Sequence, residues 1–498
     1  RKDYHLIIIY LELMSKEFFN NSIYSKELIT RSEKITFTKE SSFNVMKRAA
    51  KACYNFISQN YSVCKVLVIC GPGNNGGDGL LIAQMLYEEG YSVNVYFPLG
   101  VSKTQDSSIA YGSLNKDLVI KAINNLSEYK LIIDALFGFN FNKPLNERTQ
   151  LLINSLNKTS AVKIAIDVPS GIYCDTGKID KIAFKANRTL ALHRLKRCHV
   201  LLPGKEYSGQ ITLLDIKVAN LDKDNSVELI ERPTLKLPTL QMHKYSRGEL
   251  LIIASREMFG ASKLTTLAAS QTAFKSGAGI VKLLVHENDI DIYKHHVLEE
   301  ILLVYKTLSE LKLLIKNNST IVFGCGLKNT KLNQDILNYI LTKKVSIVFD
   351  AGAFSIMSNN KENFKKLLRN HKGQKVLTPH FGEFSKVFQV SDNKINDCLN
   401  AAKETDSVVL LKGNDTVIAN KNGNIKINYF TSPFLATAGT GDILAGLIGS
   451  FLAQGYSNFQ AATYGCYIHS QSAIKLDRNF AASELTNEIP FLVRKLSK

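Results

Sequence analysis

The chain has 498 residues, of which 45% are hydrophobic and 21% charged, and its formal net charge is +18. This composition excludes a disordered chain and a membrane-embedded one, and the length predicts two or three domains. The longest apolar run falls far short of the roughly 20 residues that span a bilayer. The basic residues are dispersed without a stripe, tail or binding motif, so we expect no nucleic-acid partner and no membrane partner.

Eight cysteines are scattered along the sequence without a Cys-x-x-Cys pair. We expect buried, reduced thiols rather than disulfides or metal ligands, as is usual in a cytoplasmic protein. The short apolar run near the start lacks the cleavage site of a signal peptide, so we expect a cytoplasmic location. We also expect a homo-oligomer of unspecified size. The cysteines are Cys53, Cys64, Cys70, Cys174, Cys198, Cys325, Cys398 and Cys466.

Two halves separate near residues 222–240, where a polar stretch precedes two prolines. We predict an N-terminal extension at 1–25, a first domain at 26–225, a linker at 226–238 and a second domain at 239–498. Both halves alternate apolar runs of strand length with helical patterns, which is typical of parallel α/β folds. The predicted strands are residues 66–70, 93–97, 131–136 and 163–168 in the first half, and 250–254, 280–285, 320–323, 345–349 and 408–411 in the second.

A glycine-rich segment, residues 71–79, follows the first predicted strand and opens a helix that we expect to end near Gly90. Glycines at such a junction let backbone amides approach a phosphate, and the helix N-terminus favours its negative charge. Tight turns also use glycine for structural reasons, so the glycines alone decide little. The polar side chains favour a binding loop, which consists of Asn74, Asn75, Gly76, Gly77 and Asp78.

Two further strand ends of the first half carry acids, Asp134 and Asp167. Because the carboxyl ends of parallel strands meet at one edge of a sheet, we expect Asn75, Asp78 and both acids to form one site. A single acid at a strand end could equally cap a helix. Three strand ends that deliver polar side chains beside a glycine loop favour a binding site.

These motifs, with their order and spacing, resemble the NAD(P)H-hydrate epimerase domain over roughly residues 25–220. The resemblance implies a Rossmann-like fold in which residues 74–78 and 138–144, including Gly138, bind a hydrated NADH or NADPH. It also implies a potassium ion bound by Asn75, Asp134 and Ser170. Asp167 would be the acid–base residue that interconverts the R and S configurations, a proton transfer suited to a carboxylate. Residues 139–142 depart from the glycine pattern of that family.

The second half carries a Gly-Thr-Gly-Asp motif at residues 439–442, followed by a helical pattern. Backbone amides at such a helix start can neutralise charge on a phosphoryl group, and Asp442 can accept a proton from a hydroxyl. The aspartate could instead only stabilise the helix start. A second feature, a predicted strand followed by a turn of nucleotide-binding type, favours the interpretation of this motif as part of a nucleotide site. That turn consists of Lys412, Gly413, Asn414, Asp415 and Thr416.

Together the second-half motifs resemble the ribokinase-like fold and, more narrowly, NAD(P)H-hydrate dehydratase over about residues 240–495. The resemblance implies that the S hydrate contacts Ala261, Gly326, His380 and Asp442, with Asp442 catalytic. It implies that residues 412–416 and Gly441 bind an adenine nucleotide. We expect ADP with magnesium rather than ATP, because the chain resembles the bacterial arrangement of the family. A lone histidine such as His380 is more often structural, but its Thr-Pro-His-Phe-Gly-Glu setting favours substrate contact.

Three positions in the second half depart from the family pattern, and they keep alternatives open. Gly352 replaces an acid of an Asp-Ala-Asp-Ala motif, Lys328 replaces a glycine, and Cys325 replaces a proline. The second half could therefore be a small-molecule kinase, for example for a vitamin alcohol, because such kinases share the Gly-Thr-Gly-Asp motif. It could also be a degenerate nucleotide-binding module.

Overall fold

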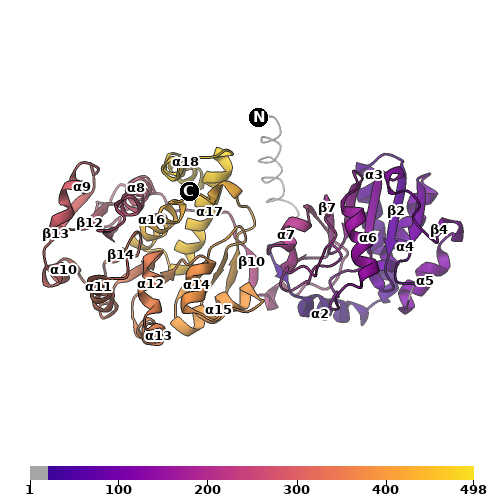
Figure 1. Ribbon diagram of the computed structural model, residues 1–498, viewed down its shortest axis with the longest axis horizontal. Coiled ribbons are helices and arrows are strands. Elements are labelled where there is room, and N and C mark those ends of the chain that lie inside the picture. The colour runs from indigo at the N-terminus through magenta and orange to yellow at the C-terminus, as the bar shows by residue number, and fades with distance from the viewer. Residues whose placement is uncertain (1–20, 102, 277, 498) are drawn as a thin grey trace. The chain divides into compact units, whose positions relative to one another are not determined.

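The computed structural model describes residues 21–101, 103–276 and 278–497, and the chain divides into two compact units between Glu228 and Leu229 (Figure 1). The expected extension at residues 1–25 falls mostly on residues 1–20, which lie outside the described residues. Ile23–Tyr24, however, form strand β1, which pairs in parallel with β8 (Leu195–Lys196). The expected linker at residues 226–238 contains strand β10 (Val227–Leu229).

The first unit is built on a seven-stranded sheet with the order β4-β3-β2-β5-β6-β7-β9, and all its neighbouring strands run parallel. Its central strands are buried runs of branched apolar residues, as expected where helices cover both faces. The strand order reverses direction between β2 and β5, which places a topological switch point there. The strands are β2 (Lys65–Cys70), β3 (Ser92–Tyr96), β4 (Val119–Ile120), β5 (Leu131–Ala135), β6 (Val162–Ile166), β7 (Arg188–Leu192) and β9 (Gln210–Leu214).

Helices cover both faces of this sheet and bury two separate apolar cores. On one face α4 packs between α3 and α5 and also against β2, β3 and β5. On the other face, side chains of α6 join the second core. The helices of the unit are α2 (Lys26–Phe37), α3 (Ser42–Asn60), α4 (Asn74–Glu88), α5 (Gln105–Ser113), α6 (Glu147–Asn157) and α7 (Gly204–Tyr207).

The second sheet has ten strands in the order β10-β19-β18-β17-β16-β15-β14-β11-β12-β13, and all of them except β10, which includes residues on both sides of the division, lie in the second unit. The strands from β17 to β13 run parallel, whereas β18 is antiparallel to both of its neighbours, β17 and β19. Here the strand order reverses between β11 and β14. The strands are β11 (Glu249–Ile253), β12 (Ile280–His286), β13 (Ile301–Tyr305), β14 (Thr320–Phe323), β15 (Ser346–Phe349), β16 (Lys375–Leu377), β17 (Val408–Leu411), β18 (Val417–Ala419) and β19 (Ile425–Ile427).

Two groups of helices cover this second sheet (Figure 1). Helix α16 packs against α8 and α17, and α18 packs against α8 and α17, so the four form one layer. The other group includes α12 to α15. The bounds are α8 (Phe259–Ser276), α9 (Ile290–Lys294), α10 (Leu308–Leu314), α11 (Lys331–Leu341), α12 (Gly352–Ser358), α13 (Lys361–Asn370), α14 (Phe381–Val387), α15 (Lys394–Thr405), α16 (Thr440–Ala453), α17 (Asn458–Leu476) and α18 (Leu485–Leu496).

The structure confirms the α/β class and all nine predicted strands, with ends that differ by at most two residues. One local expectation was wrong. The segment at residues 71–79 is not a loop throughout, because α4 begins at Asn74 and takes in the whole Asn-Asn-Gly-Gly-Asp-Gly run. The helix ends at Glu88, and Gly90 follows with a φ of 92°, a conformation that suits glycine.

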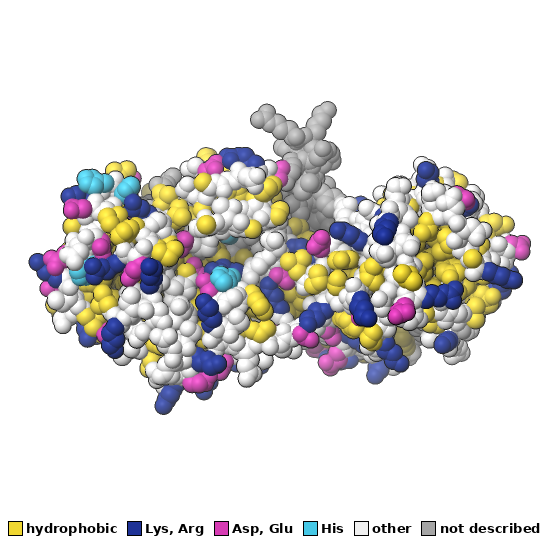
Figure 2. Space-filling model, viewed as in Figure 1, with side chains coloured by type: hydrophobic (Ala, Val, Ile, Leu, Met, Phe, Trp, Pro, Cys, Tyr) yellow, Lys and Arg dark blue, Asp and Glu magenta, His cyan; other side chains and the backbone are white. Residues whose placement is uncertain are grey.

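In the described part of the chain, no helix combines the length and apolar character that a membrane crossing requires. On the face shown in Figure 2, lysine and arginine side chains are spread over the surface instead of gathering in one patch. This distribution agrees with the dispersed basic residues of the sequence.

Candidate active sites

A cavity of about 620 Å³ opens in the first unit at the switch point between β2 and β5. Its walls include Asn74, Asn75 and Asp78 from the start of α4, together with Asp167 after β6. Every residue of the segment 138–144, which follows β5, also lines it. The first-half residues singled out from the sequence therefore meet at one edge of the sheet.

The glycines of this segment serve close packing of the helix. A Cβ at Gly76 would lie 1.9 Å from the carbonyl oxygen of Gly71, and one at Gly79 would lie 2.5 Å from the Cβ of Ala135. A Cβ at Gly77 would lie 2.7 Å from the methyl carbon of Met46. Gly76 and Gly77 are buried and do not line the cavity. Gly76 and Gly79 bring α4 close to the end of β2 and to β5, and Gly77 brings it against Met46 of α3, so that Asn74, Asn75 and Asp78 reach the cavity.

Asp167 is held in an unusual backbone conformation, with a φ of 67°, and its side chain is buried. Its Oδ1 accepts a hydrogen bond from Nζ of Lys196, which also donates to the carbonyl oxygen of Leu192 at 2.6 Å. Its Oδ2 accepts from the backbone N–H of Phe139 at 3.2 Å. A non-glycine residue with positive φ costs energy and is most often retained at functional sites.

Gly138 lies where the Asn75 amide and the Asp167 carboxylate approach each other. A Cβ on Gly138 would lie 3.4 Å from both Asn75 Oδ1 and Asp167 Oδ2. Asn74 instead points its Oδ1 to the Thr104 hydroxyl at 2.6 Å. Burial, followed by the charge of Asp167, raises the pKa of Asp78 well above its ordinary value. A neutral Asp78 can donate a hydrogen bond into the cavity.

Asp134 and Ser170 lie beneath the turn at residues 136–138. Asp134 Oδ1 accepts from the Ser170 hydroxyl at 2.7 Å and from the Leu136 N–H at 3.1 Å, and its Oδ2 accepts from the Ser170 N–H at 2.8 Å. The Ser170 hydroxyl oxygen accepts from the Phe137 N–H at 2.9 Å. Burial raises the pKa of Asp134 to about 6, although the Ser170 hydrogen bonds oppose that rise.

Among the titratable residues that line the cavity, the sequence analysis missed three, namely Glu33, His193 and Lys196. Burial and then the charge of Asp167 raise the pKa of Glu33 to about 7. Burial lowers the pKa of His193 to about 3, and neither ring nitrogen has a hydrogen-bond partner among the described residues. No motif marks these positions, because Glu33 comes from α2, His193 from the turn between β7 and β8, and Lys196 from β8.

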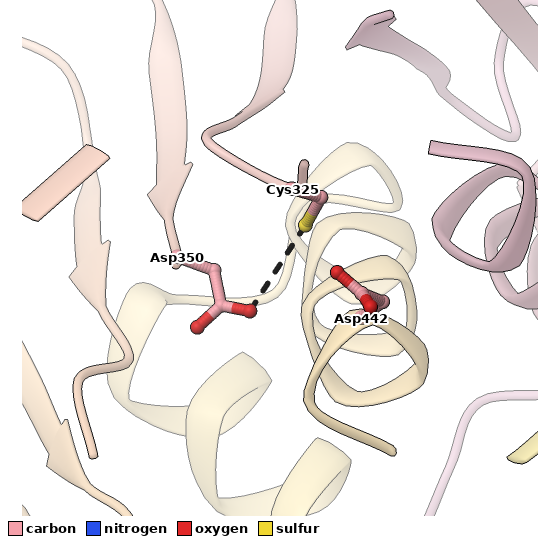
Figure 3. A group of neighbouring side chains, drawn as sticks. All are labelled: Cys325, Asp350 and Asp442. Carbon is pink, nitrogen blue, oxygen red and sulfur yellow. Dashed lines mark hydrogen bonds between the residues drawn. The ribbon is translucent and has the colours of Figure 1, made fainter. Parts of the chain in front are cut away.

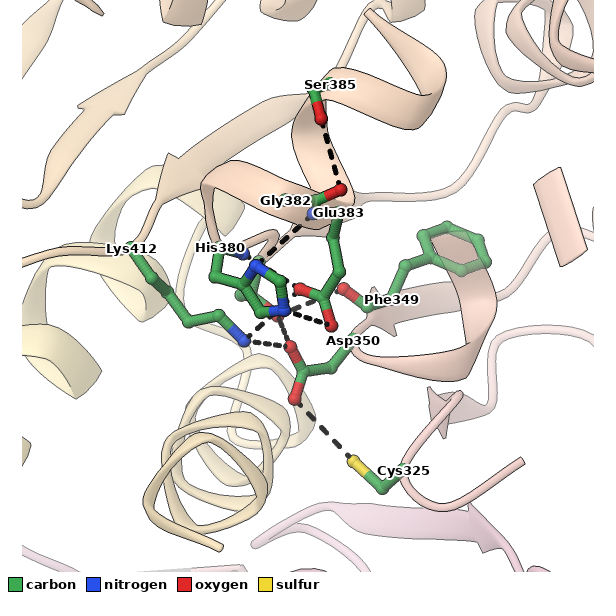
Figure 4. Close-up of polar contacts among 9 residues, drawn as sticks. Cys325, Phe349, Asp350, His380, Gly382, Glu383, Ser385 and Lys412 are labelled. Atoms are coloured by element: carbon green, nitrogen blue, oxygen red, sulfur yellow. Dashed lines mark hydrogen bonds and ion pairs between the residues drawn. The ribbon is translucent and has the colours of Figure 1, made fainter. Parts of the chain in front are cut away.

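In the second unit, functional side chains follow four neighbouring parallel strands. Cys325 follows β14, Asp350 follows β15, Thr378 and His380 follow β16, and Lys412 follows β17. Lys412 Nζ lies 2.7 Å from Asp350 Oδ1, to which the Thr378 hydroxyl donates at 2.8 Å (Figure 4). Burial acts to lower the pKa of Lys412, but the charges of Asp350 and Glu383 outweigh it and raise that pKa. Asp350 was absent from the sequence-based site, yet it anchors this edge.

Asp442 stands in the first turn of α16, beside this group (Figure 3). The preceding Gly439 has a φ of 90° and caps the helix. A Cβ at Gly441 would lie 3.3 Å from Lys412 Nζ and 3.6 Å from Asp350 Oδ2. Burial, followed by the charge of Asp350, raises the pKa of Asp442 to about 7. A lysine, a helix N-terminus and a basic carboxylate therefore converge, which is what phosphoryl transfer requires.

The turn after Lys412 closes on itself. The Thr416 hydroxyl donates to the Gly413 carbonyl oxygen at 2.7 Å and accepts from the Gly413 N–H at 3.2 Å. Asp415 is buried and forms an ion pair with Lys394. Asn414 is exposed, and its carbonyl oxygen accepts from the Thr431 hydroxyl at 3.0 Å. The turn is thus rigid at its base and open to solvent at residues 413–414.

The expected substrate contacts of the second unit divide into two places. Ala261 and Gly326 lie together, because a Cβ at Gly326 would lie 3.1 Å from that of Ala261. The His380 side chain is 59% exposed, and its Nε2 lies 3.4 Å from Glu383 Oε1. His380 also caps α14, since its Nδ1 accepts from the Glu383 N–H while Glu383 Oε2 accepts from the His380 N–H. His380 thus caps α14 and also keeps part of its ring exposed, where a ligand can contact it.

The structure shows the surroundings of the three residues that depart from the family pattern. A Cβ at Gly352 would lie 1.8 Å from the carbonyl oxygen of Leu327, and the preceding Ala351 has a φ of 46°. Lys328 is exposed, and its carbonyl oxygen accepts from Asn333 Nδ2 at 2.9 Å. Cys325 is buried next to Asp350. The backbone around Gly352 is therefore closed to any side chain.

Comparison with known proteins agrees with this division. Residues 250–492 match the family of NAD(P)H-hydrate dehydratase, and residues 42–198 match the family of the YjeF-related protein N-terminus. A bifunctional NAD(P)H-hydrate repair enzyme Nnr from Synechocystis is 30% identical, with coverage of 82% of this chain and 81% of the relative. The chain belongs to the bifunctional NAD(P)H-hydrate repair enzymes.

Other members of this family match over similar lengths. The repair enzyme Nnr of Dictyoglomus turgidum is 28% identical and covers 90% of this chain and 93% of its own length. Among solved structures, the ADP/ATP-dependent NAD(P)H-hydrate dehydratase of Bacillus subtilis is 26% identical, with a TM-score of 0.45. It covers 53% of this chain and 95% of its own length. The family match of residues 250–492 and the α/β sheet of the second unit agree with the second domain that its motifs predicted.

Proposed function

We propose that the chain repairs hydrated NADH and NADPH in two steps. The first unit interconverts the R and S hydrates, and the second removes water from the S hydrate with ADP as phosphoryl donor. The observation that carries the proposal is shared by both units: a carboxylate, Asp167 or Asp442, stands at the switch-point edge of a parallel sheet beside a glycine-rich helix start. Family membership supports the choice of substrate.

In the first unit, Asp167 is the acid–base residue. Lys196 holds Oδ1, whereas Oδ2 accepts from the Phe139 N–H and also faces Gly138 and Asn75, so Oδ2 is the oxygen that would meet bound hydrate. Residues 138–144, with Asn74 and Asn75, enclose the dinucleotide in the cavity. Asp78 donates a hydrogen bond in its neutral form, as a substrate amide or hydroxyl requires.

Potassium would be held by Asn75, Asp134 and Ser170. All three contact the turn at residues 136–138. Each offers an oxygen atom as a metal ligand, and oxygen ligands suit a hard cation. The buried Asn75 Nδ2 has no hydrogen-bond partner in the described part of the chain, which is consistent with an amide oriented by a ligand. Bound there, the ion would offset the negative charge of the substrate phosphates.

In the second unit, Asp442 accepts the proton of the ring hydroxyl while the hydroxyl oxygen attacks the terminal phosphorus of ADP. AMP leaves with the electrons of the broken P–O bond. The phosphorylated oxygen then leaves the ring as phosphate, a neighbouring ring carbon loses its proton, and the double bond of the intact nicotinamide forms. Lys412 and the amides of the α16 start, at Gly441, stabilise the phosphoryl charge.

Magnesium would enter with the phosphates of ADP, and the oxygens of Asp350, Glu383 and Asp442 fit such a cation at this edge. Its charge would offset that of the phosphates. Ala261 and Gly326 would contact the hydrate, while residues 413–416 border the nucleotide and His380 approaches the substrate from the exposed side. A cytoplasmic, homo-oligomeric enzyme remains our prediction for the cell.

The test supplies a mixture of R and S hydrates and follows the return of nicotinamide absorbance. With ADP, wild-type protein should convert both epimers completely, and Asp442→Asn should abolish the return. Asp167→Asn should stall when the S form is consumed and leave the R form behind. If phosphate stays attached to an organic product, the second unit is a small-molecule kinase. If nucleotide binds without turnover, it is a binding module.

A further inference from the structure

The proposed phosphoryl-transfer site of the second unit contains a thiol beside its two aspartates. Cys325 stands where the resembled motif has a proline, and its side chain is buried directly after β14. Its Sγ lies 4.0 Å from Asp350 Oδ2 (Figure 3). One oxygen of Asp350, one of Asp442 and the sulfur all lie within 4.8 Å of one another.

The two oxygens of Asp350 have different surroundings. Oδ1 accepts hydrogen bonds from the Thr378 hydroxyl and from Lys412 Nζ. Among the described residues, Oδ2 has only the weak contact with the Cys325 thiol, although Asp350 is 1% exposed. A buried carboxylate oxygen without an N–H or O–H donor costs folding free energy, and it points at the same space as the thiol. Such an oxygen indicates a missing positive partner.

The chemistry of the three donors selects the class of cation. A thiolate with two carboxylates suits a borderline-soft divalent ion such as Zn²⁺, whereas Mg²⁺ takes oxygen ligands. Zinc bonds of about 2.3 Å to sulfur and about 2.0 Å to oxygen would require the donors to approach by roughly 1 Å. Asp442, at the partly exposed start of α16, leaves room for that approach and for water as a fourth ligand.

We propose that Cys325, Asp350 and Asp442 form an inhibitory site for a thiophilic divalent cation of the Zn²⁺ type. Binding forms a metal–sulfur bond and breaks the S–H bond, whose proton passes to solvent, and no electron is transferred. The cation occupies the lone pairs with which Asp442 takes the hydroxyl proton, so it stops dehydration. This inhibitory effect rests on the proposed role of Asp442, but the binding does not.

The binding test uses Co²⁺ alone as a probe on the full chain after treatment with chelator. A cobalt–thiolate bond gives an intense charge-transfer absorption that oxygen and nitrogen ligands lack. Wild-type protein should show this band, and Cys325→Ser and Cys325→Ala should lose it. Cys466→Ala is the matched control, because Cys466 is another buried thiol but lies within α17. Absence of the band from wild type, or its persistence in both Cys325 variants, overturns the site.

The inhibition test titrates free Zn²⁺ during dehydration with excess Mg²⁺ and ADP. Loss of the sulfur ligand should weaken inhibition at least about tenfold in Cys325→Ala relative to wild type, when each protein is compared with its own zinc-free rate. Epimerisation by the first unit of the same chain is the internal control and should continue. Equal inhibition of wild type and Cys325→Ala contradicts the proposal. A cobalt band without zinc inhibition would retain the site and refute its control of Asp442.

Discussion

Lys196 donates a hydrogen bond from Nζ to Asp167 Oδ1 at a position where the two side chains are only 1% and 5% exposed. A buried ion pair of this kind adds little net stability, but loss of one partner leaves an uncompensated charge. The pair therefore makes Asp167, the proposed acid–base residue, dependent on a lysine from strand β8.

Lys196→Met should lower the free energy of unfolding by about 3–5 kcal/mol and reduce epimerisation at least about a hundredfold, because Asp167 loses its buried partner and its orientation. Urea denaturation and the rate of R-to-S conversion measure the two effects. The double variant Asp167→Asn, Lys196→Met should regain most of the stability without activity. Equal instability of the single and double variants would contradict this account.

The dehydration rate should rise with pH through about 7, because burial and the Asp350 charge raise the pKa of Asp442 to about 7. Below that pH the carboxyl group is protonated and cannot accept the hydroxyl proton. Asp350→Asn should shift the midpoint to lower pH, since it removes one cause of the raised pKa. The pH profile of turnover with saturating ADP measures this, and an unchanged midpoint would argue against Asp442 as the titrating base.

Glu33 should make the first unit less stable at alkaline pH. Its folded-state pKa is about 7 and its ordinary value is 4.5, so the folded chain binds the proton more tightly. The stability that this proton contributes is complete below about pH 4.5 and is lost as pH rises through about 7. Glu33→Gln should therefore equal wild type at low pH and gain up to about 3 kcal/mol in unfolding free energy at pH 8.

The control for Glu33→Gln is Glu27→Gln, because Glu27 is an exposed acid on the same helix, α2. Urea denaturation at pH 4.5 and pH 8 should show no pH-dependent gain for Glu27→Gln. If both variants respond alike, the burial of Glu33 is not the cause.

Gly76→Ala should destabilise the first unit by more than about 3 kcal/mol, because its Cβ would lie 1.9 Å from a backbone oxygen that has no room to retreat. Gly73→Ala is the matched control in the same segment, since a Cβ there meets nothing within 4 Å. Thermal unfolding of both variants measures the difference. Similar losses at the two positions would mean that the glycines serve chain flexibility rather than helix packing.

Strands and the edge of the sheet at which polar side chains gather could be predicted from the sequence, because apolar runs and glycine-rich turns are local patterns. Asp134, Asp167 and Lys412 followed from that logic, since Asp134 lies near the end of the buried strand β5 and the other two come directly after buried strands. The start of α4 was misplaced because glycines are poor helix formers, and only contacts with Gly71 and Ala135 reveal why they are there.

Partners brought together by the tertiary fold escaped the sequence analysis. Lys196 lies 29 residues from Asp167, and Glu33 comes from a helix that no motif marks. Asp350 was noticed only for the acid missing beside it, whereas its own ion pair with Lys412 spans 62 residues. Such pairings depend on strand order and register, which local patterns do not specify.

The closed backbone at Gly352 also bears on how this chain can change. An aspartate at that position would collide with the carbonyl oxygen of Leu327 unless residues 324–327 moved as well. A single Gly352→Asp substitution is therefore not enough to place a second acid at this edge. New side chains can therefore enter this site more easily at positions that have space around them than at Gly352.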